Sequence, residues 1–316
     1  MVESLAVQSS TPERALRPLF ARPDVTSTRA GIILLLAGVM LFSVSDVLAK
    51  QLSRTLPSPE ITWLRYLMLS IVAIVLAAPR GMSLLKPSRP GLQVLRGLAS
   101  LGSAAFFLLS LGRLGVAEAT AISFVAPALI TCLSIPLLGE RVGWRRWAAT
   151  LVGLAGVLIV VRPGGGVLGP AALMPLASAI CGALAVIVTR KMGTGARART
   201  TLLWSALIGL LLLTLSAGLW FEPPTRRELW LGLAMGSTYA VGQLLMILAY
   251  RQGEASLLAP FTYAQILSSG FLGFIVLGAA PGATTLAGML VILMSGAYTL
   301  RRERVVRRAA SSPRHG

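Results

Sequence analysis

The chain has 316 residues, of which 55% are hydrophobic and 13% are charged, and its mean hydropathy is +0.77. Soluble domains of this length carry about twice that share of charged residues, so the composition predicts an integral membrane protein and excludes an ordinary soluble enzyme. The net charge of +18 comes from 29 Lys and Arg against 11 Asp and Glu. Because the arginines are scattered between apolar runs, they indicate basic loops facing anionic lipid, not a nucleic-acid-binding surface.

Ten apolar runs have the length, or nearly the length, of about 20 residues that a helix needs to cross the hydrocarbon core. They predict spanning helices over residues 31–50, 60–79, 92–112, 118–138, 145–162, 170–190, 201–220, 229–250, 255–278 and 283–300. We expect a disordered basic tail over residues 1–29 and a basic tail over residues 303–316. Since the first run has full spanning length and nine more follow, a cleaved signal peptide is not expected.

The basic residues are distributed unevenly between the two sides of this ten-helix scheme. If the N-terminus lies inside, 22 Lys and Arg fall on the inner side and 6 on the outer side, with Arg65 inside a span. The positive-inside rule therefore predicts that both termini lie in the cytoplasm.

Ten helices divide into two halves of five, 30–163 and 168–302, and an odd number per half predicts an inverted repeat. Weak internal similarity agrees: LGRLGVAEA (111–119) aligns with AYRQGEASL (249–257). The second half has Leu277-Gly278-Ala279 where the first half has the acid of Gly139-Glu140. We therefore expect no symmetric role for Glu140, which we place at the inner end of the fourth helix.

Two prolines inside the spans predict kinks. Proline has no N–H group and its ring opposes a helical conformation in the preceding turn, so it leaves a backbone carbonyl that needs another partner. We expect kinks beside a central cavity near Pro127 and Pro260.

Few ionisable residues lie in the spans, where insertion scales assign a charge a cost of roughly 2.5–3.5 kcal/mol. Asp46 in the first helix and Arg65 in the second lie at similar depth on helices joined by a short loop, which predicts an ion pair facing the bundle interior. The i, i+4 spacing of Asp46 and Lys50 leaves open a local pair that only closes the helix end. Arg96 lies near the inner end of the third helix, and we expect it to be an ordinary arginine that faces the cytoplasmic side of the membrane.

Polar and aromatic side chains recur in the spans, and rings with a few amides suit a cavity for a planar or zwitterionic ligand. The candidates for lining a substrate cavity are Asp46, Arg65, Trp63, Phe124, Tyr239, Gln243, Tyr263 and Gln265. Catalytic motifs are missing: the GGG run at 164–166 lacks the Gly-Lys-Ser/Thr of a phosphate-binding loop, and no HExxH, GxSxG or cysteine cluster occurs. We expect neither an enzyme nor a bound cofactor or metal.

Several motifs together resemble the ten-helix EamA-type permeases of the drug/metabolite transporter superfamily. The residues that carry the resemblance are SDVLAK (45–50), PEITWLRY (59–66), LRG (95–97), AEATAISFVAP (117–127), LLGERVGWRRW (137–147), GLAGVLIVVRP (153–163), ASLLAPFTY (255–263) and TLRRE (299–303). Within the superfamily, Asp46, Lys50 and Arg65 followed by LRG and WRRW look most like the branch of S-adenosylmethionine uptake transporters and riboflavin importers.

The resemblance implies an all-α integral membrane protein of a bacterial inner membrane, with ten transmembrane helices in two inverted five-helix repeats. It also implies ATP-independent uptake of a small polar metabolite, such as S-adenosylmethionine or riboflavin, by alternating access. Export of amino acids or drugs is one alternative, and a membrane scaffold without transport is another. The expected partners are a small-molecule substrate and membrane lipid, without nucleic acid, and the chain could pair as a homodimer.

Overall fold

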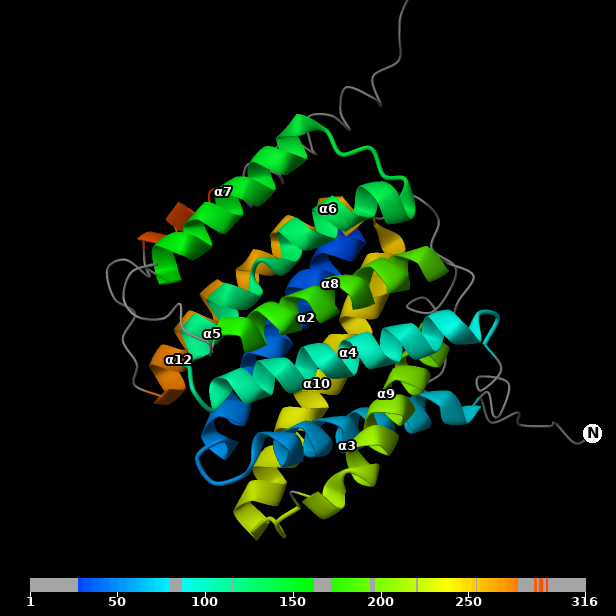
Figure 1. Ribbon diagram of the computed structural model, residues 1–316, viewed down its shortest axis with the longest axis vertical. Helices are drawn as coiled ribbons and strands as arrows, with labels where there is room; N and C mark the ends of the chain where they lie inside the picture. Colours follow the sequence, from blue (N-terminus) through cyan, green and yellow to red (C-terminus); the bar gives the residue numbers. More distant parts are fainter. Residues whose placement is uncertain are drawn as a thin grey trace, which may run out of the picture.

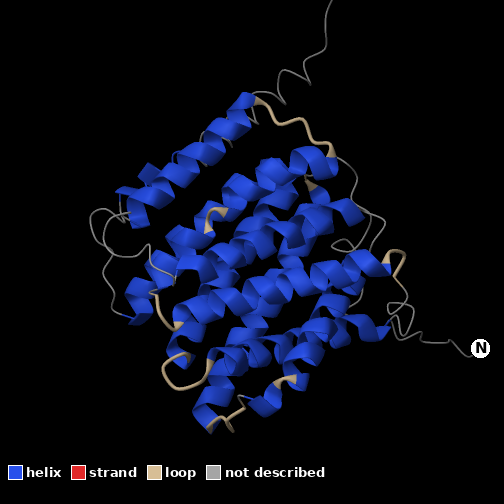
Figure 2. Ribbon diagram, in the orientation of Figure 1, coloured by secondary structure: helices blue, strands red, loops and turns tan. Residues whose placement is uncertain are grey.

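The computed structural model describes residues 28–79, 87–114, 116–161, 172–193, 197–219, 221–253 and 255–277, and five positions between 287 and 294. Over these residues the chain is helical and contains no strand (Figure 2). The helices in Figure 1 are α2 (Thr28–Leu52), α3 (Ser58–Ala77), α4 (Pro90–Leu111), α5 (Val116–Ser123), α6 (Ala126–Leu138), α7 (Trp144–Val161), α8 (Leu173–Met192), α9 (Ala198–Leu215), α10 (Arg226–Gln252), α11 (Ala255–Leu258) and α12 (Ala264–Leu277). Two short 3-10 helices, η3 (Ala217–Leu219) and η4 (Ala259–Tyr263), complete the set.

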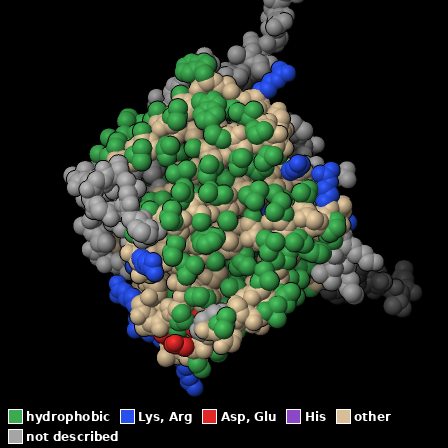
Figure 3. Space-filling view, viewed as in Figure 1, with side chains coloured by type: hydrophobic (Ala, Val, Ile, Leu, Met, Phe, Trp, Pro, Cys, Tyr) green, Lys and Arg blue, Asp and Glu red, His purple; other side chains and the backbone are tan. Residues whose placement is uncertain are grey.

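Six of the described helices, α2, α3, α4, α8, α9 and α10, are long and apolar enough to cross a membrane. Large apolar side chains on the outside of the bundle remain exposed, among them Leu211, Trp230 and Phe271. Figure 3 shows a face covered mainly by hydrophobic side chains, with Lys and Arg near its edges. In water such a surface would aggregate, whereas lipid solvates it.

Most of the predicted spans correspond to single helices. The first three predicted spans are α2 to α4, and the fifth to the eighth are α7 to α10, with ends that differ by a few residues. The tenth predicted span, 283–300, and both predicted tails lie largely or wholly outside the described residues. The count of ten helices therefore stays a prediction.

The fourth and ninth predicted spans are each broken in two, and the expected kinks are confirmed. Between α5 and α6 the helix is interrupted at Phe124 and Val125, and Pro127 follows in the first turn of α6. Between α11 and α12 the chain tightens into η4, which has a proline at its start. At both places the proline cannot donate the hydrogen bond that a continuous helix requires.

The described helices pack around α2 and α10, which run against each other through the middle of the bundle (Figure 1). A Cβ atom on Gly242 would lie 3.1 Å from the backbone oxygen of Gly38 and 2.9 Å from the ring of Phe42. These two glycines therefore allow the backbones of α2 and α10 to approach closely, as small residues do in membrane helix pairs. Smaller contacts join α4 to α8, α3 to α9 and α6 to α8.

Substitution of Gly242 tests this close approach. Gly242→Ala is expected to lower the free energy of unfolding by about 1–3 kcal/mol, because the new methyl group meets a backbone atom that cannot move aside. Gly273→Ala is the matched control, since a Cβ atom there has no neighbour within 4 Å among the described residues. Thermal unfolding of the detergent-solubilised variants measures the difference, and equal melting temperatures would contradict the packing argument.

Candidate functional site

A cavity of about 230 Å³ lies inside the helix bundle. Its walls come from α2, α3, α4, α5, α6, α8, α10, η4 and α12, so residues far apart in the sequence meet there. Three charged side chains line it: Asp46, Arg65 and Arg96. Its aromatic lining consists of Phe42, Phe107, Phe124, Tyr239 and Tyr250. Apolar walls with a few convergent polar groups are typical of a small-molecule site.

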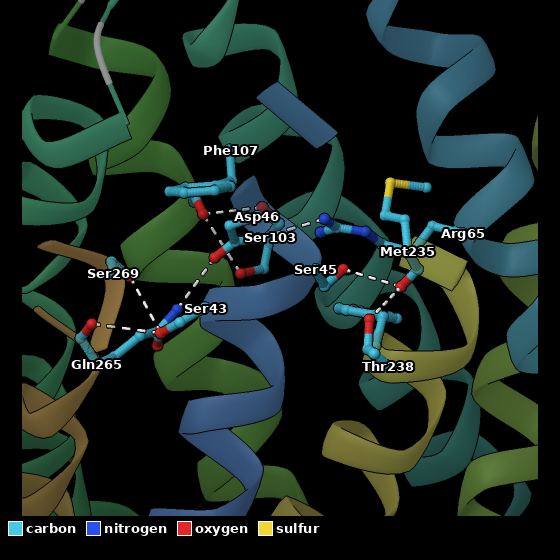
Figure 4. Close-up of polar contacts among 12 residues, drawn as sticks. Ser43, Ser45, Asp46, Arg65, Ser103, Phe107, Met235, Thr238, Gln265 and Ser269 are labelled. Carbon is cyan, nitrogen blue, oxygen red and sulfur yellow. Dashed lines mark hydrogen bonds and ion pairs between the residues drawn. The ribbon is translucent and has the colours of Figure 1, made fainter. Parts of the chain in front are cut away.

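Asp46 is the carboxylate at the centre of the polar contacts in this cavity. It is 4% exposed, and Arg65, which is 2% exposed, places Nη2 3.2 Å from Asp46 Oδ1. Gln265 Nε2 donates to Asp46 Oδ2 at 3.1 Å. Figure 4 shows Arg65 and Gln265 reaching Asp46 from opposite sides. The predicted Asp46–Arg65 pair is thus confirmed, and each oxygen of the buried carboxylate has a donor, as burial requires.

Lys50, the competing partner for Asp46, is engaged elsewhere. Its Nζ donates to the backbone oxygens of Leu111 at 2.9 Å and Leu114 at 3.3 Å. Leu111 is the last residue of α4, where the helix dipole favours a cation, and Leu114 lies in the turn just after it. The lysine therefore caps a neighbouring helix instead of pairing with the aspartate four residues before it.

Tyr239 links the ion pair to α10. The Arg65 guanidinium lies 4.6 Å from the centroid of the Tyr239 ring, a cation–π contact. The Phe42 ring packs against the same tyrosine with centroids 5.3 Å apart, and Gln243 Nε2 donates to Tyr239 Oη at 3.4 Å. The guanidinium is consequently held by a carboxylate on one helix and a ring on another.

Serine hydroxyls fix α2 against its neighbours beside the aspartate. Ser43 Oγ lies 2.6 Å from Ser268 Oγ and 3.1 Å from Ser269 Oγ on α12. Ser45 Oγ donates to the backbone oxygen of Met235 on α10 at 3.0 Å. These contacts set the register of α12 relative to α2, and with it the position of Gln265 beside Asp46 (Figure 4).

Of the eight residues predicted to line a cavity, the structure brings six together. Asp46, Arg65, Phe124, Tyr239, Gln243 and Gln265 all line the cavity. Trp63 instead donates from Nε1 to Thr214 Oγ1 at 3.0 Å and packs edge-on against Phe221. Trp63 comes two residues before Arg65, which turns it about 200° around the helix, so the two side chains face opposite ways.

Tyr263 is the other predicted residue that the structure places in helix packing. A Cβ atom on Gly153 of α7 would collide with its ring, and its hydroxyl donates to the backbone oxygen of Thr150 at 3.3 Å. Its ring packs against that of Phe124, with centroids 5.5 Å apart, and Phe124 lines the cavity whereas Tyr263 does not. Tyr263 therefore supports the cavity wall from behind.

Arg96 is the cavity residue that the sequence analysis misjudged. It is 3% exposed and lines the cavity, although its position near a helix end suggested an ordinary loop-facing arginine. Its Nε donates to Thr189 Oγ1 at 3.2 Å, and its Nη1 donates to Ser205 Oγ. The LRG motif marked the position, but only the packing of α4 against α8 and α9 shows that the side chain turns inward.

Two glutamates connect distant segments at the ends of helices. Glu140, after α6, accepts from Ala255 N at 3.0 Å and so satisfies a free N–H group at the start of α11, with Arg190 Nε 3.8 Å away. Glu60, fully buried in the first turn of α3, accepts from Glu222 N at 3.2 Å. Glu140 thus has a specific structural role at the start of the ninth predicted span, beyond ending the fourth.

Removing only the cation of the Asp46–Arg65 pair is expected to destabilise the protein more than removing both charges. Arg65→Met should lower the free energy of unfolding by about 3–5 kcal/mol, because it leaves Asp46 buried without its cation. The double variant Asp46→Asn with Arg65→Met should be more stable than Arg65→Met alone, since no buried charge then remains in the pair. Chemical unfolding of the purified variants measures both effects. A double variant no more stable than Arg65→Met would argue against neutralisation as the role of Arg65.

Comparison with known proteins agrees with the resemblance read from the motifs. The EamA-like transporter family matches the chain twice, over residues 29–162 and 169–301. One crystal structure of a protein superposes on this chain with a TM-score of 0.72 and is 23% identical to it in sequence. The match covers 90% of this chain and 99% of the other. At that identity the likeness concerns the fold alone.

Curated relatives share most of their length with this chain. The S-adenosylmethionine uptake transporter of Rickettsia bellii is 28% identical over 274 residues, which are 87% of this chain and 94% of the relative. The riboflavin transporter of Rhizobium johnstonii is 30% identical over 278 residues, which are 85% and 90%. The pseudopaline exporter of Pseudomonas aeruginosa is 26% identical over 271 residues, which are 84% and 94%. The chain therefore belongs to the EamA-like transporter family and is a multi-pass membrane transporter of bacterial type.

Proposed function

We propose that the protein is a secondary, ATP-independent transporter that moves a small polar metabolite across a bacterial inner membrane by alternating access. In this proposal ten helices form two inverted five-helix repeats, 30–163 and 168–302, and both termini lie in the cytoplasm. The observation that carries it is the cavity lined by the Asp46–Arg65 pair and Gln265. Buried ionisable groups that face the interior of a membrane bundle mark substrate pathways.

The cavity joins the two matched halves of the chain. Asp46 and Arg65 come from the first match, whereas Tyr239 and Gln265 come from the second. The cation–π contact of Arg65 with Tyr239 and the hydrogen bond from Gln265 to Asp46 therefore both join the two halves. Relative motion of two such halves around a central site is the basis of alternating access.

The substrate that we favour is S-adenosylmethionine or a related metabolite such as riboflavin. Relatives named for these two compounds align over most of this chain. Both compounds carry a planar heteroaromatic ring with polar groups attached, and the cavity offers rings of Phe42, Phe107, Phe124 and Tyr239 beside amides and hydroxyls. Export remains the alternative direction, because the pseudopaline exporter aligns over a similar length.

Proteoliposomes containing the purified protein test the proposal. Uptake and efflux of S-adenosylmethionine, riboflavin and amino acids are measured without ATP. Asp46→Asn should reduce transport of the accepted compound at least about 10-fold, because it removes a charged hydrogen-bonding group from the cavity wall. Arg54→Gln, at an exposed arginine in the turn after α2, is the control and should transport normally. If no compound in the panel moved in either direction, the proposed function would be wrong.

A further inference from the structure

Arg96 carries a positive charge into the cavity that the described protein residues do not neutralise. Its two recorded hydrogen bonds both go to neutral hydroxyls, those of Thr189 and Ser205. Among the residues that the structure describes, no carboxylate lies within ion-pair distance of its guanidinium. Arg65, the other cavity arginine, has Asp46 as its counter-ion.

The two hydroxyls hold the guanidinium in one orientation. Thr189 Oγ1 donates its proton to the backbone oxygen of Ala185 at 2.7 Å, and Ser205 Oγ donates to that of Thr201 at 2.9 Å. Because each hydroxyl proton is directed to its own helix, each oxygen presents a lone pair to Arg96. An arginine has five N–H donors, so two are used and Nη2 has no acceptor among the described residues.

Close helix packing brings these groups together. A Cβ atom on Gly97, the residue after Arg96, would lie 2.8 Å from the side chain of Ile208 on α9. The glycine therefore lets α4 approach α9 closely enough for Arg96 to reach Ser205. The arginine is thus held in place by both α8 and α9 before any ligand enters.

The charges lining the cavity do not balance. Asp46 and Arg65 cancel, and Arg96 leaves one formal positive charge. A cation in apolar surroundings is costly unless a counter-charge comes within reach. Since the described walls do not supply that charge, a ligand with an anionic group would.

We propose that Arg96 binds a carboxylate of the transported metabolite, so that the substrate class is a carboxylate-bearing metabolite. This inference rests on the proposed transport function. A carboxylate matches the site because one unneutralised guanidinium balances one negative charge and can donate from adjacent N–H groups to both oxygens. A phosphate dianion would leave a negative charge unbalanced beside Asp46.

The rest of the cavity suits a carboxylate on an elongated molecule that has a ring at its other end. Arg96 lies in the second turn of α4, whereas Phe107 lies in the last. At 1.5 Å per residue, about 16 Å of helix separates them. An amino-acid group at Arg96 and a ring near Phe107 and Phe124 would occupy both regions.

Ligand binding by the purified full-length protein tests the assignment without relying on transport. The probes are pairs that differ only in the carboxylate: S-adenosylmethionine with decarboxylated S-adenosylmethionine, and aromatic amino acids with their amides. Thermal stabilisation and dissociation constants are measured for wild type, Arg96→Gln, Arg96→Lys and Arg113→Gln. Arg113 is exposed, so its variant removes the same charge outside the cavity.

We expect wild type and Arg113→Gln to bind the carboxylate member of at least one pair better than its partner. Arg96→Gln should lose roughly 10- to 100-fold in affinity for that carboxylate and none for the partner. Arg96→Lys should recover part of the loss, since the charge returns without the two-pronged geometry. Absence of any preference in the wild type, or an unchanged preference in Arg96→Gln, would overturn the proposal.

Transport separates this failure from failure of the proposed function. If proteoliposomes moved riboflavin, which has no carboxylate, but none of the carboxylate-bearing compounds, transport would stand and the carboxylate assignment would fall. If no compound moved but the carboxylate preference depended on Arg96, the binding site would stand and the transport proposal would fall.

Discussion

A carboxylate inside a bundle of apolar helices has to be neutralised from neighbouring helices, and the arrangement around Asp46 meets this constraint. Each of its oxygens accepts a hydrogen bond, one from Arg65 on α3 and one from Gln265 on α12. The guanidinium in turn lies over Tyr239 on α10. Four helices are therefore positioned by one buried acid, and the cavity wall is built from their contacts.

Helix ends supply partners that a search for oppositely charged residues overlooks. Lys50 is occupied by the carbonyls of Leu111, the last residue of α4, and of Leu114 just beyond it, and Glu140 accepts from the first backbone N–H group of α11. The partial charges at helix termini thus decide which ions remain available for pairing. This is why Asp46 pairs across helices although a lysine stands one helical turn away.

The sequence predicts well what depends on depth along a helix and poorly what depends on direction around it. Apolar runs located the helices from α2 to α10, and matching depth on adjacent helices predicted the Asp46–Arg65 pair. Depth alone did not show that Trp63 faces away from Arg65 or that Tyr263 fills the space above Gly153. Arg96 was misjudged for the same reason, because its inward direction depends on hydroxyls of α8 and α9 that lie about a hundred residues away in sequence.

The polar contacts inside the cavity differ in strength according to which halves of the chain they join. The charge–charge pair, Asp46 with Arg65, lies wholly within residues 29–162. The contacts from this pair and from Arg96 to residues 169–301 each have one uncharged partner: Gln265, Tyr239, Thr189 or Ser205. Breaking a contact with an uncharged partner affects a single charge, whereas separating an ion pair in an apolar interior leaves two bare charges. In the proposed alternating access, separation of the two halves would therefore break contacts that have an uncharged partner and leave the Asp46–Arg65 ion pair intact.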